Sequence, residues 1–166
     1  MSVSDMRLAD AGGWLGDLLE QQNLRIATAE SCTGGWVAKV LTDRAGSSAY
    51  VHGGLVTYSN EAKQELLGVT EQSLREHGAV SEAVVREMVA GCLAVTKVDV
   101  AVAISGVAGP GGGTEEKPVG MVWFAWGRSP SDTEAVCQHF PGDRDAVRRE
   151  AVLFALLGLR RFLDES

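Results

Sequence analysis

Hydrophobic residues recur along this chain at two spacings, one typical of helices and the other of strands. Leu8, Leu15, Leu18 and Leu19 fall on one face of an amphipathic helix. Patterns of this kind predict helices over residues 4–22, 34–43, 60–67, 71–77, 81–94 and 143–163. The centre of the last helix, residues 151–157, is apolar nearly all round, so we expect it to be buried in the core or against another subunit.

Shorter apolar runs predict the strands of a sheet. They cover residues 25–29, 50–58, 98–105, 119–126 and 133–140. The run over 98–105 is continuously small and apolar, which is typical of a central strand covered on both faces. The last two runs alternate partly and are joined by residues 127–132, so they predict a hairpin. In the second run, Gly53 and Gly54 indicate a bulge or a close backbone approach.

The order of these elements predicts the fold class. Helices and strands alternate at first, and three strands then follow one another before the last helix. This order predicts an α/β protein, a three-layer α/β/α sandwich on a mixed, partly antiparallel sheet. The length of 166 residues is typical of a single domain, here residues 1–166.

Composition excludes several classes of protein. No apolar run approaches the roughly 18 residues that a membrane-spanning helix needs, and the N-terminus does not resemble a signal peptide. Three cysteines without a short-spaced pair argue against disulfides and zinc, and predict a cytoplasmic protein. The formal net charge of -7 argues against nucleic-acid binding. Because metal-ligand spacings are absent too, we expect neither a metal nor a cofactor.

A candidate catalytic segment is the junction of a strand and a helix over residues 25–37, RIATAESCTGGWV. Ser31 lies there, where free backbone N–H groups gather before a helix. A serine at this position can be a nucleophile, with the N–H groups of Cys32, Thr33 and Gly34 as oxyanion donors. Gly35 would let a substrate approach the backbone.

Two other interpretations of this junction stay open. Ser31 and Thr33 could simply cap the helix, with Thr33 as the N-cap. Cys32 is a rival nucleophile, although a free cysteine is most often a small buried hydrophobic residue.

A serine nucleophile needs a base, and Lys63 is the leading candidate. It falls in the first turn of the helix that we expect Asn60 to cap, where the helix dipole lowers the pKa of a lysine. Such a lysine can accept the serine proton, as in Ser-Lys hydrolases. The hydroxyl of Tyr58 could relay the proton or orient Ser31. The alternative is a solvated lysine and a tyrosine at the edge of the core.

Two later segments could bind an anion. The loop over residues 106–118 is rich in glycine, and its N–H groups can surround an anion, although it matches neither a P-loop nor a dinucleotide motif. A carboxylate in it could bind a ribose hydroxyl. Arg144 follows Asp143, a good N-cap, at the start of the last helix, where a phosphate would be bound well. The alternatives are a long surface loop and a pair between Arg144 and Asp145.

Five segments together resemble the CinA C-terminal domain family, and are most similar to its stand-alone, PncC-type members, the nicotinamide-nucleotide amidohydrolases. These segments are AESCTGGWVAKVLTDRAGSS, VTYSNEAKQELLGV, HGAVSE, AISGVAGPGGGTEEKPVGMVWFAW and GDRDAVRREA. The resemblance runs from about residue 5 to residue 164. Longer members carry an additional N-terminal domain, whose activity is not implied for this chain.

The resemblance implies a function. The family hydrolyses the carboxamide of nicotinamide mononucleotide to nicotinate mononucleotide and ammonia, which recycles the pyridine nucleotide. It implies that Ser31, Tyr58 and Lys63 are catalytic. It also implies substrate contacts by Gly35, Ser48, Ser105, Gly106, Gly109, Thr114, Glu116 and Arg144.

The sequence also allows two functions other than catalysis, and it predicts an oligomer. The chain could be a nucleotide-binding or regulatory module without turnover, or it could have a protein-interaction role linked to competence. The apolar final helix leads us to expect a homo-oligomer.

Overall fold

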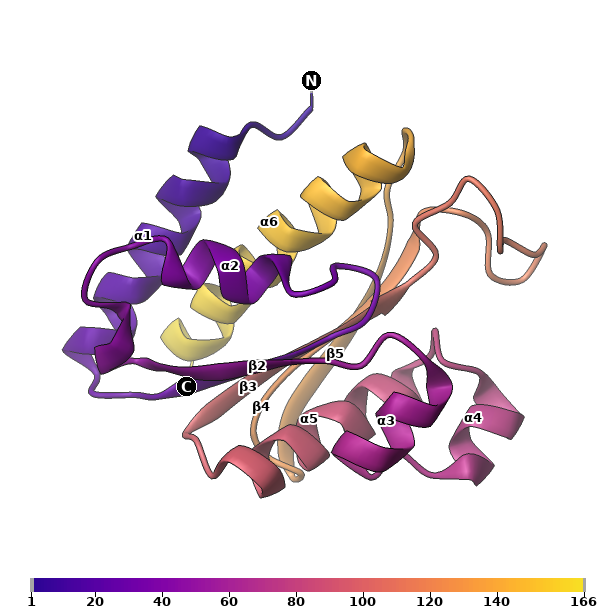
Figure 1. The fold of residues 1–166 in the computed structure, drawn as a ribbon, viewed down its shortest axis with the longest axis horizontal. Coiled ribbons are helices and arrows are strands. Elements are labelled where there is room, and N and C mark those ends of the chain that lie inside the picture. The colour runs from indigo at the N-terminus through magenta and orange to yellow at the C-terminus, as the bar shows by residue number, and fades with distance from the viewer. Residues whose placement is uncertain (1, 166) are drawn as a thin grey trace.

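The computed structural model describes residues 2–165 (Figure 1). The elements are α1 (Asp5–Gln21), β1 (Ile26–Glu30), α2 (Trp36–Thr42), the 3-10 turn η1 (Ser47–Ala49), β2 (Val51–Val56), α3 (Asn60–Leu67), α4 (Glu71–His77), α5 (Glu82–Thr96), β3 (Val100–Gly106), β4 (Met121–Ser129), β5 (Asp132–His139) and α6 (Arg144–Asp164). The predicted order of helices and strands is confirmed, with ends that differ by a few residues.

The strands form one mixed sheet in the order β2-β1-β3-β4-β5. β1 pairs in parallel with β2 and β3, whereas β4 is antiparallel to both β3 and β5. Glu30 at the end of β1 lies opposite Val56 and Ile104. The carboxyl ends of three neighbouring parallel strands therefore meet at one edge of the sheet, which is where open α/β sheets bind ligands.

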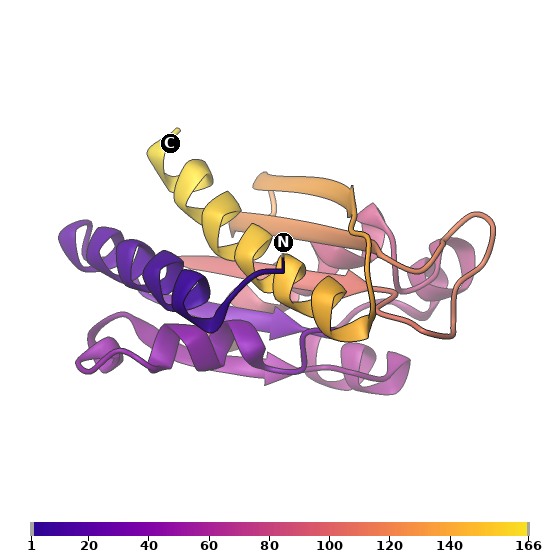
Figure 2. The same ribbon diagram turned by 90° about the horizontal axis from the view of Figure 1, so that it is seen from above.

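Helices cover both faces of this sheet, so the predicted three-layer sandwich is confirmed. α1, α2 and α6 lie on one face, and α3, α4 and α5 lie on the other (Figure 1). Seen from above, α1 and α6 run obliquely over the strands (Figure 2). Alternate residues of β1 serve the two layers, because Ile26 packs with α1 and α6 whereas Ala27 and Ala29 pack with α5.

The centre of α6 belongs to the core rather than to an open surface. Ala151, Val152, Ala155 and Leu156 are buried. The indole of Trp126 on β4 donates a hydrogen bond to the Ala155 carbonyl oxygen at 3.0 Å. Most of the expected burial of this segment is therefore met within one chain, although Leu157 is exposed. Within residues 2–165, no helix combines the length and the apolar character that crossing a membrane requires.

Two predicted helix caps are wrong. Ser59, not Asn60, is the N-cap of α3, and its hydroxyl accepts the Ala62 N–H at 3.0 Å. α2 begins at Trp36 after Gly35, which has a φ of 96° and offers no side chain as a cap. Thr33 lies before the N-cap position of this helix, and its hydroxyl donates to a buried carboxylate.

Candidate active site

The structure brings Ser31 to the α3 side of the sheet. Ala29 packs toward α5, and the next side chain, Glu30, turns to α2, so Ser31 turns back to the α3 side. The Ser31 N–H donates to the Ile104 carbonyl oxygen at 3.0 Å, which extends the pairing of β1 with β3 by one residue. The position of Ser31 is thus set by the sheet itself.

Lys63 is the direct partner of Ser31. Its Nζ lies 2.9 Å from the Ser31 Oγ, and the side chain is 1% exposed. The same Nζ donates to the carbonyl oxygens of Thr57 at 2.8 Å and Tyr58 at 3.2 Å. Burial lowers the pKa of Lys63, since the charged form is poorly solvated there. The predicted direction of the shift agrees, but its leading cause is burial rather than the helix dipole.

The phenol of Tyr58 points elsewhere. Tyr58 is 60% exposed, and its Oη accepts a hydrogen bond from the Arg144 Nη2 at 3.0 Å. The backbone of Tyr58 is what faces Ser31, because its carbonyl oxygen lies 3.4 Å from the Ser31 Oγ. Within residues 2–165 the predicted contact between the Tyr58 hydroxyl and Ser31 is absent. In this geometry the side chain that contacts the Ser31 Oγ is that of Lys63.

Glu30 is a site residue that the sequence did not reveal. Its carboxylate is fully buried and accepts four hydrogen bonds. The donors are the hydroxyls of Thr28 and Thr33 and the N–H groups of Val37 and Ala38. The first turn of α2 therefore already holds an anion of the protein's own. A single acid at the end of an otherwise apolar strand was the available signal.

The free backbone N–H groups near Ser31 belong to the turn that follows it, not to α2. The Ser31 carbonyl oxygen accepts the Gly34 N–H at 3.0 Å, which closes a turn over Cys32 and Thr33. In the described part of the chain, the N–H groups of Cys32 and Thr33 have no hydrogen-bond partner. The geometry thus favours these two as oxyanion donors and does not favour Gly34.

Arg148 is the second site residue that sequence reasoning missed. From α6 its Nε donates to the Cys32 carbonyl oxygen at 3.0 Å, and its Nη2 donates to the Thr33 carbonyl oxygen at 3.3 Å. The guanidinium also lies over the Trp36 ring, 5.5 Å from the ring centroid. Arg148 and Cys32 are 116 residues apart, and no short motif indicates a contact over that distance.

Cys32 is poorly suited to be the nucleophile. Its side chain is buried, and burial raises the pKa of the thiol to about 12. The thiolate, which is the reactive form, is therefore scarce near neutral pH. This observation favours Ser31 over its rival.

The predicted anion-binding residues meet at the start of α6. Arg144 connects the glycine-rich loop to the segment after β2, because its Nη1 donates to the Gly109 carbonyl oxygen at 2.7 Å while its Nη2 binds Tyr58. A hollow of about 330 Å³ opens beside Arg144. It is lined by Ala108, Pro110, Val119, Gly142, Asp143, Arg144 and Asp145. Arginine and two acids thus share one wall.

The outer part of the glycine-rich loop extends away from the strands (Figure 2). Thr114 and Glu116 are exposed there, and the Thr114 hydroxyl accepts the Lys117 N–H at 3.0 Å. The Lys117 ammonium donates to the carbonyl oxygen of His77 at the end of α4. The loop is therefore attached across the molecule, and substrate contacts by Thr114 and Glu116 stay predictions.

Two predicted substrate residues lie beside Ser31 and one lies far from it. Ser105 and Gly106 end β3, the parallel neighbour of β1, and Ser105 is buried. Ser48 lies in η1, before β2 begins, whereas Ser31 follows the end of β1. A six-residue strand is about 20 Å long. Within one chain Ser48 cannot contact the same ligand as Ser31, so that prediction is wrong.

This chain is similar to known proteins over nearly its whole length. The family model described as the CinA C-terminal domain matches residues 11–163. The nicotinamide-nucleotide amidohydrolase PncC of Escherichia coli strain K12 is 52% identical over 99% of this chain and 100% of its own length. The protein of that name from Enterobacter agglomerans is 49% identical over 97% and 99%.

A solved structure shows the same fold. The crystal structure described as a competence-damaged protein (CinA) superfamily protein from Klebsiella pneumoniae 700603 has a TM-score of 0.92 and 41% identity. The match covers 96% of this chain and 99% of the other. With its sheet, its Ser31 junction and its full-length relatives, this chain belongs to the CinA C-terminal domain family.

Proposed function

We propose that this chain hydrolyses the carboxamide of nicotinamide mononucleotide to nicotinate mononucleotide and ammonia, a step that recycles pyridine nucleotides. The observation that carries the proposal is the buried pair of Lys63 and Ser31, with 2.9 Å between Nζ and Oγ. Full-length relatives that are about half identical carry the name of this activity.

The surroundings of Lys63 suit a neutral amine. A neutral amine has two N–H groups and one lone pair, and the carbonyl oxygens of Thr57 and Tyr58 accept those two N–H groups. The lone pair then faces the Ser31 hydroxyl and takes its proton. Ser31 attacks the carboxamide carbon at the same time.

The remaining steps follow from the same groups. The N–H groups of Cys32 and Thr33 bind the negative oxygen of the tetrahedral intermediate. The Lys63 ammonium returns its proton to the amide nitrogen, so that ammonia leaves and an ester of Ser31 remains. Lys63, neutral again, activates a water molecule that attacks the ester. This attack releases the carboxylic acid and restores the hydroxyl of Ser31.

The nucleotide part of the substrate would extend from Ser31 toward Arg144. Tyr58, Gly109 and Arg144 connect these two places. The Arg144 guanidinium and nearby N–H groups of the glycine-rich loop are the candidates for the phosphate. The roles of Gly35, Ser105, Gly106, Thr114 and Glu116 as substrate contacts belong to the same proposal.

Ammonia release from nicotinamide mononucleotide by the purified protein tests the proposal. We expect Ser31→Ala and Lys63→Ala to lower kcat by at least about 10³-fold, since each group of such a unit is required. Lys39→Ala is a matched control, because Lys39 is an exposed lysine that pairs with Asp43. Full activity in either of the first two variants would contradict the mechanism.

A nucleotide-binding module without turnover is not favoured, because an isolated binding site does not need a lysine buried against a serine. Calorimetry of nucleotide binding, together with the ammonia assay, distinguishes the module from the amidase. Tight binding of the nucleotide without ammonia release would support the module and reject the amidase.

A further inference from the structure

Arg148 binds one peptide unit beside Ser31, the proposed nucleophile. Its Nε binds the carbonyl oxygen of Cys32, and the N–H of the same peptide unit belongs to Thr33. This peptide bond is trans, so its C=O and N–H point in opposite directions. Arg148 comes from α6, on the face of the sheet opposite to α3 (Figure 1). The Thr33 N–H therefore points away from α6.

This peptide unit is the one in the turn whose rotation would leave the closing hydrogen bond of the turn intact. The hydrogen bond from the Gly34 N–H to the Ser31 carbonyl oxygen closes a β-turn, and the unit between Cys32 and Thr33 is its middle peptide. Rotation of the middle peptide by about 180° is what separates a type I from a type II turn. Thr33 is not among the residues with positive φ, so the turn is not of type II. A flip would aim the Cys32 carbonyl oxygen where the Thr33 N–H now points.

We propose that Arg148 is a positioning residue that aims the Thr33 N–H at the oxyanion. This inference rests on the proposed role of Ser31 as nucleophile. Arg148 binds only the observed orientation, because after a flip its own N–H groups would face the N–H of Thr33. A charged donor on the Cys32 carbonyl also polarises the peptide unit, which strengthens its N–H as a donor.

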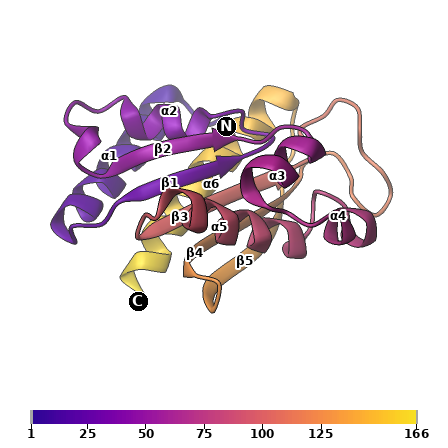
Figure 3. The same cartoon turned by 60° about the horizontal axis from the view of Figure 1, so that its bottom comes forward.

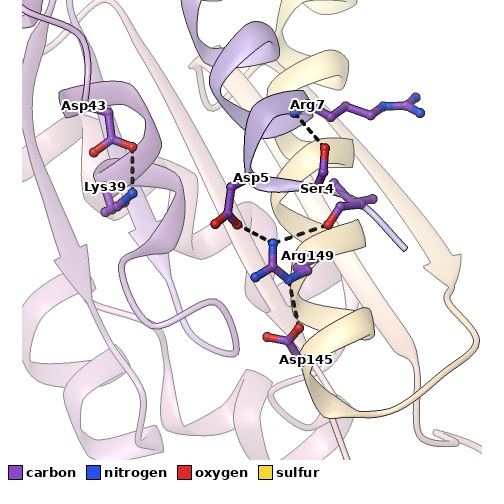
Figure 4. A network of polar contacts seen from close by, with 8 residues as sticks. Ser4, Asp5, Arg7, Lys39, Asp43, Asp145 and Arg149 are labelled. Carbon is purple, nitrogen blue, oxygen red and sulfur yellow. Dashed lines mark hydrogen bonds and ion pairs between the residues drawn. The ribbon is translucent and has the colours of Figure 1, made fainter. Parts of the chain in front are cut away.

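The neighbouring arginine provides a matched control. Arg149 lies over the same Trp36 ring, 5.1 Å from its centroid, but binds Asp5 and Asp145 (Figure 4). Within residues 2–165, Arg149 has no hydrogen bond to residues 31–35. Arg149→Met thus removes the same charge and the same ring contact as Arg148→Met while leaving the turn alone.

Kinetics on nicotinamide mononucleotide form the first test. We expect Arg148→Met to lower kcat by about 10- to 100-fold, as for a weakened oxyanion donor, with KM changed by less than about threefold. The midpoint of the pH profile should stay in place, because Lys63 is untouched. Arg148→Lys should fall in between, since an ammonium lacks the planar fork. Equal kcat values for Arg148→Met and Arg149→Met would overturn the proposal.

A fluorophosphonate probe makes the test independent of the substrate. Its phosphoryl oxygen takes the place of the oxyanion, and mass spectrometry measures the rate at which Ser31 is labelled. We expect labelling of Arg148→Met to be at least about tenfold slower than that of Arg149→Met. If Arg148→Met fails to fold, as circular dichroism would show, Arg148→Lys replaces it in both comparisons.

The two tests separate the two proposals. Labelling of Ser31 that depends on Arg148, without ammonia release, would reject nicotinamide mononucleotide as substrate and support the positioning role. A wild-type protein that is not labelled at Ser31 would overturn the positioning role together with the mechanism. A rise in KM alone would also overturn it, because oxyanion donors act in the transition state.

Discussion

At the scale of single residues, the site depends on one lysine kept away from water. Lys63 has three oxygen atoms within hydrogen-bond distance of its Nζ, and in residues 2–165 no carboxylate forms an ion pair with it. A buried ammonium without an ion-pair partner is costly, so the fold favours the neutral amine. The same burial that prepares a base therefore lowers the stability of the protein at low pH.

This cost predicts how stability depends on pH. Between the lowered pKa of Lys63 and its ordinary value of 10.5, the unfolded chain binds one more proton than the folded chain. The free energy of unfolding of the wild type therefore rises with pH in this window, by up to about 1.4 kcal/mol per pH unit. Lys63→Met lacks this term. We expect its stability relative to the wild type to be highest at the acidic end and to decline toward pH 10.5.

Urea unfolding at a series of pH values measures this difference. Lys39→Met is the control, because Lys39 is exposed and its removal should shift stability by a nearly constant amount. A difference between Lys63→Met and the wild type that does not change with pH would contradict the predicted titration of Lys63.

The residues that the sequence revealed and those that it missed differ in one physical respect. Ser31 and Lys63 stand at the ends of elements that hydrophobic spacing locates, so their proximity follows once the strands are parallel. Glu30 and Arg148 act through hydrogen bonds whose partners only the folded chain defines. Tyr58 was expected to act through its hydroxyl. The spacing of residues along the sequence does not predict where a side chain points once a strand has ended.

At the scale of elements, the position of α3 decides where Lys63 lies. α3 packs against α5 in the helix layer that lies in front of the sheet in Figure 3. The two helices are in close backbone contact at Gly91 of α5. A Cβ atom added at Gly91 would lie 1.8 Å from the Leu67 carbonyl oxygen at the end of α3. Only glycine leaves room for the backbone of α3 at this distance.

Gly91→Ala should therefore move α3 and the base that it carries. We expect a loss of about 1–3 kcal/mol in the free energy of unfolding from overpacking, together with a lower kcat as Nζ moves away from Ser31. Gly13→Ala in α1 is the counterpart, because a Cβ at Gly13 meets nothing within 4 Å. That change should stabilise the protein by up to about 1 kcal/mol through helix propensity and leave kcat unchanged.

Denaturant unfolding and ammonia release on both variants check this pair. Normal kcat in Gly91→Ala would mean that α3 tolerates the added methyl group without displacing Lys63.

The start of α2 shows why some element boundaries could not be predicted from the sequence. Threonine is a common N-cap residue. The Thr33 hydroxyl nevertheless donates to Glu30 at 2.7 Å, and α2 begins only at Trp36. A threonine hydroxyl can accept a backbone N–H as a cap or donate to a carboxylate, and its position here follows from a carboxylate buried by tertiary packing. The long periodic helices α1 and α6 have no such competition, and their ends agree with prediction to within a residue.

At the scale of the whole molecule, the site belongs to the parallel part of the sheet. Ser31, Tyr58 and Ser105 lie at the carboxyl ends of β1, β2 and β3, whereas the hairpin of β4 and β5 completes the core. The alternation of apolar segments was enough to predict this architecture. Ser48 was misplaced because a residue before a parallel strand lies at the opposite edge from one after it.

The surface over α1 and α6 is where we propose contact between copies of this chain. Met6, Trp14 and Leu157 are 75%, 53% and 38% exposed there and line a hollow of about 360 Å³. Large exposed apolar side chains gathered on one face are typical of interaction sites. We therefore expect the homo-oligomer to form through this face.

Light scattering coupled to size-exclusion chromatography tests that expectation. We expect the wild type to elute as an oligomer and Trp14→Glu to elute at a lower mass, since a carboxylate would be desolvated in the contact. Val95→Glu is the control, because Val95 is exposed on α5 in the other helix layer. A wild type of about 17.6 kDa would rule out the oligomer, and an unchanged mass in Trp14→Glu would exclude this face.

The protonated thiol of Cys32 affects how this protein responds to oxidants. Peroxides and alkylating agents react with thiolates, and a cysteine whose pKa is about 12 offers almost none in the cell. We therefore expect this residue, next to the proposed nucleophile Ser31, to react slowly with oxidants. On the same basis we expect the proposed nucleotide recycling to continue under conditions that inactivate enzymes with a catalytic thiolate.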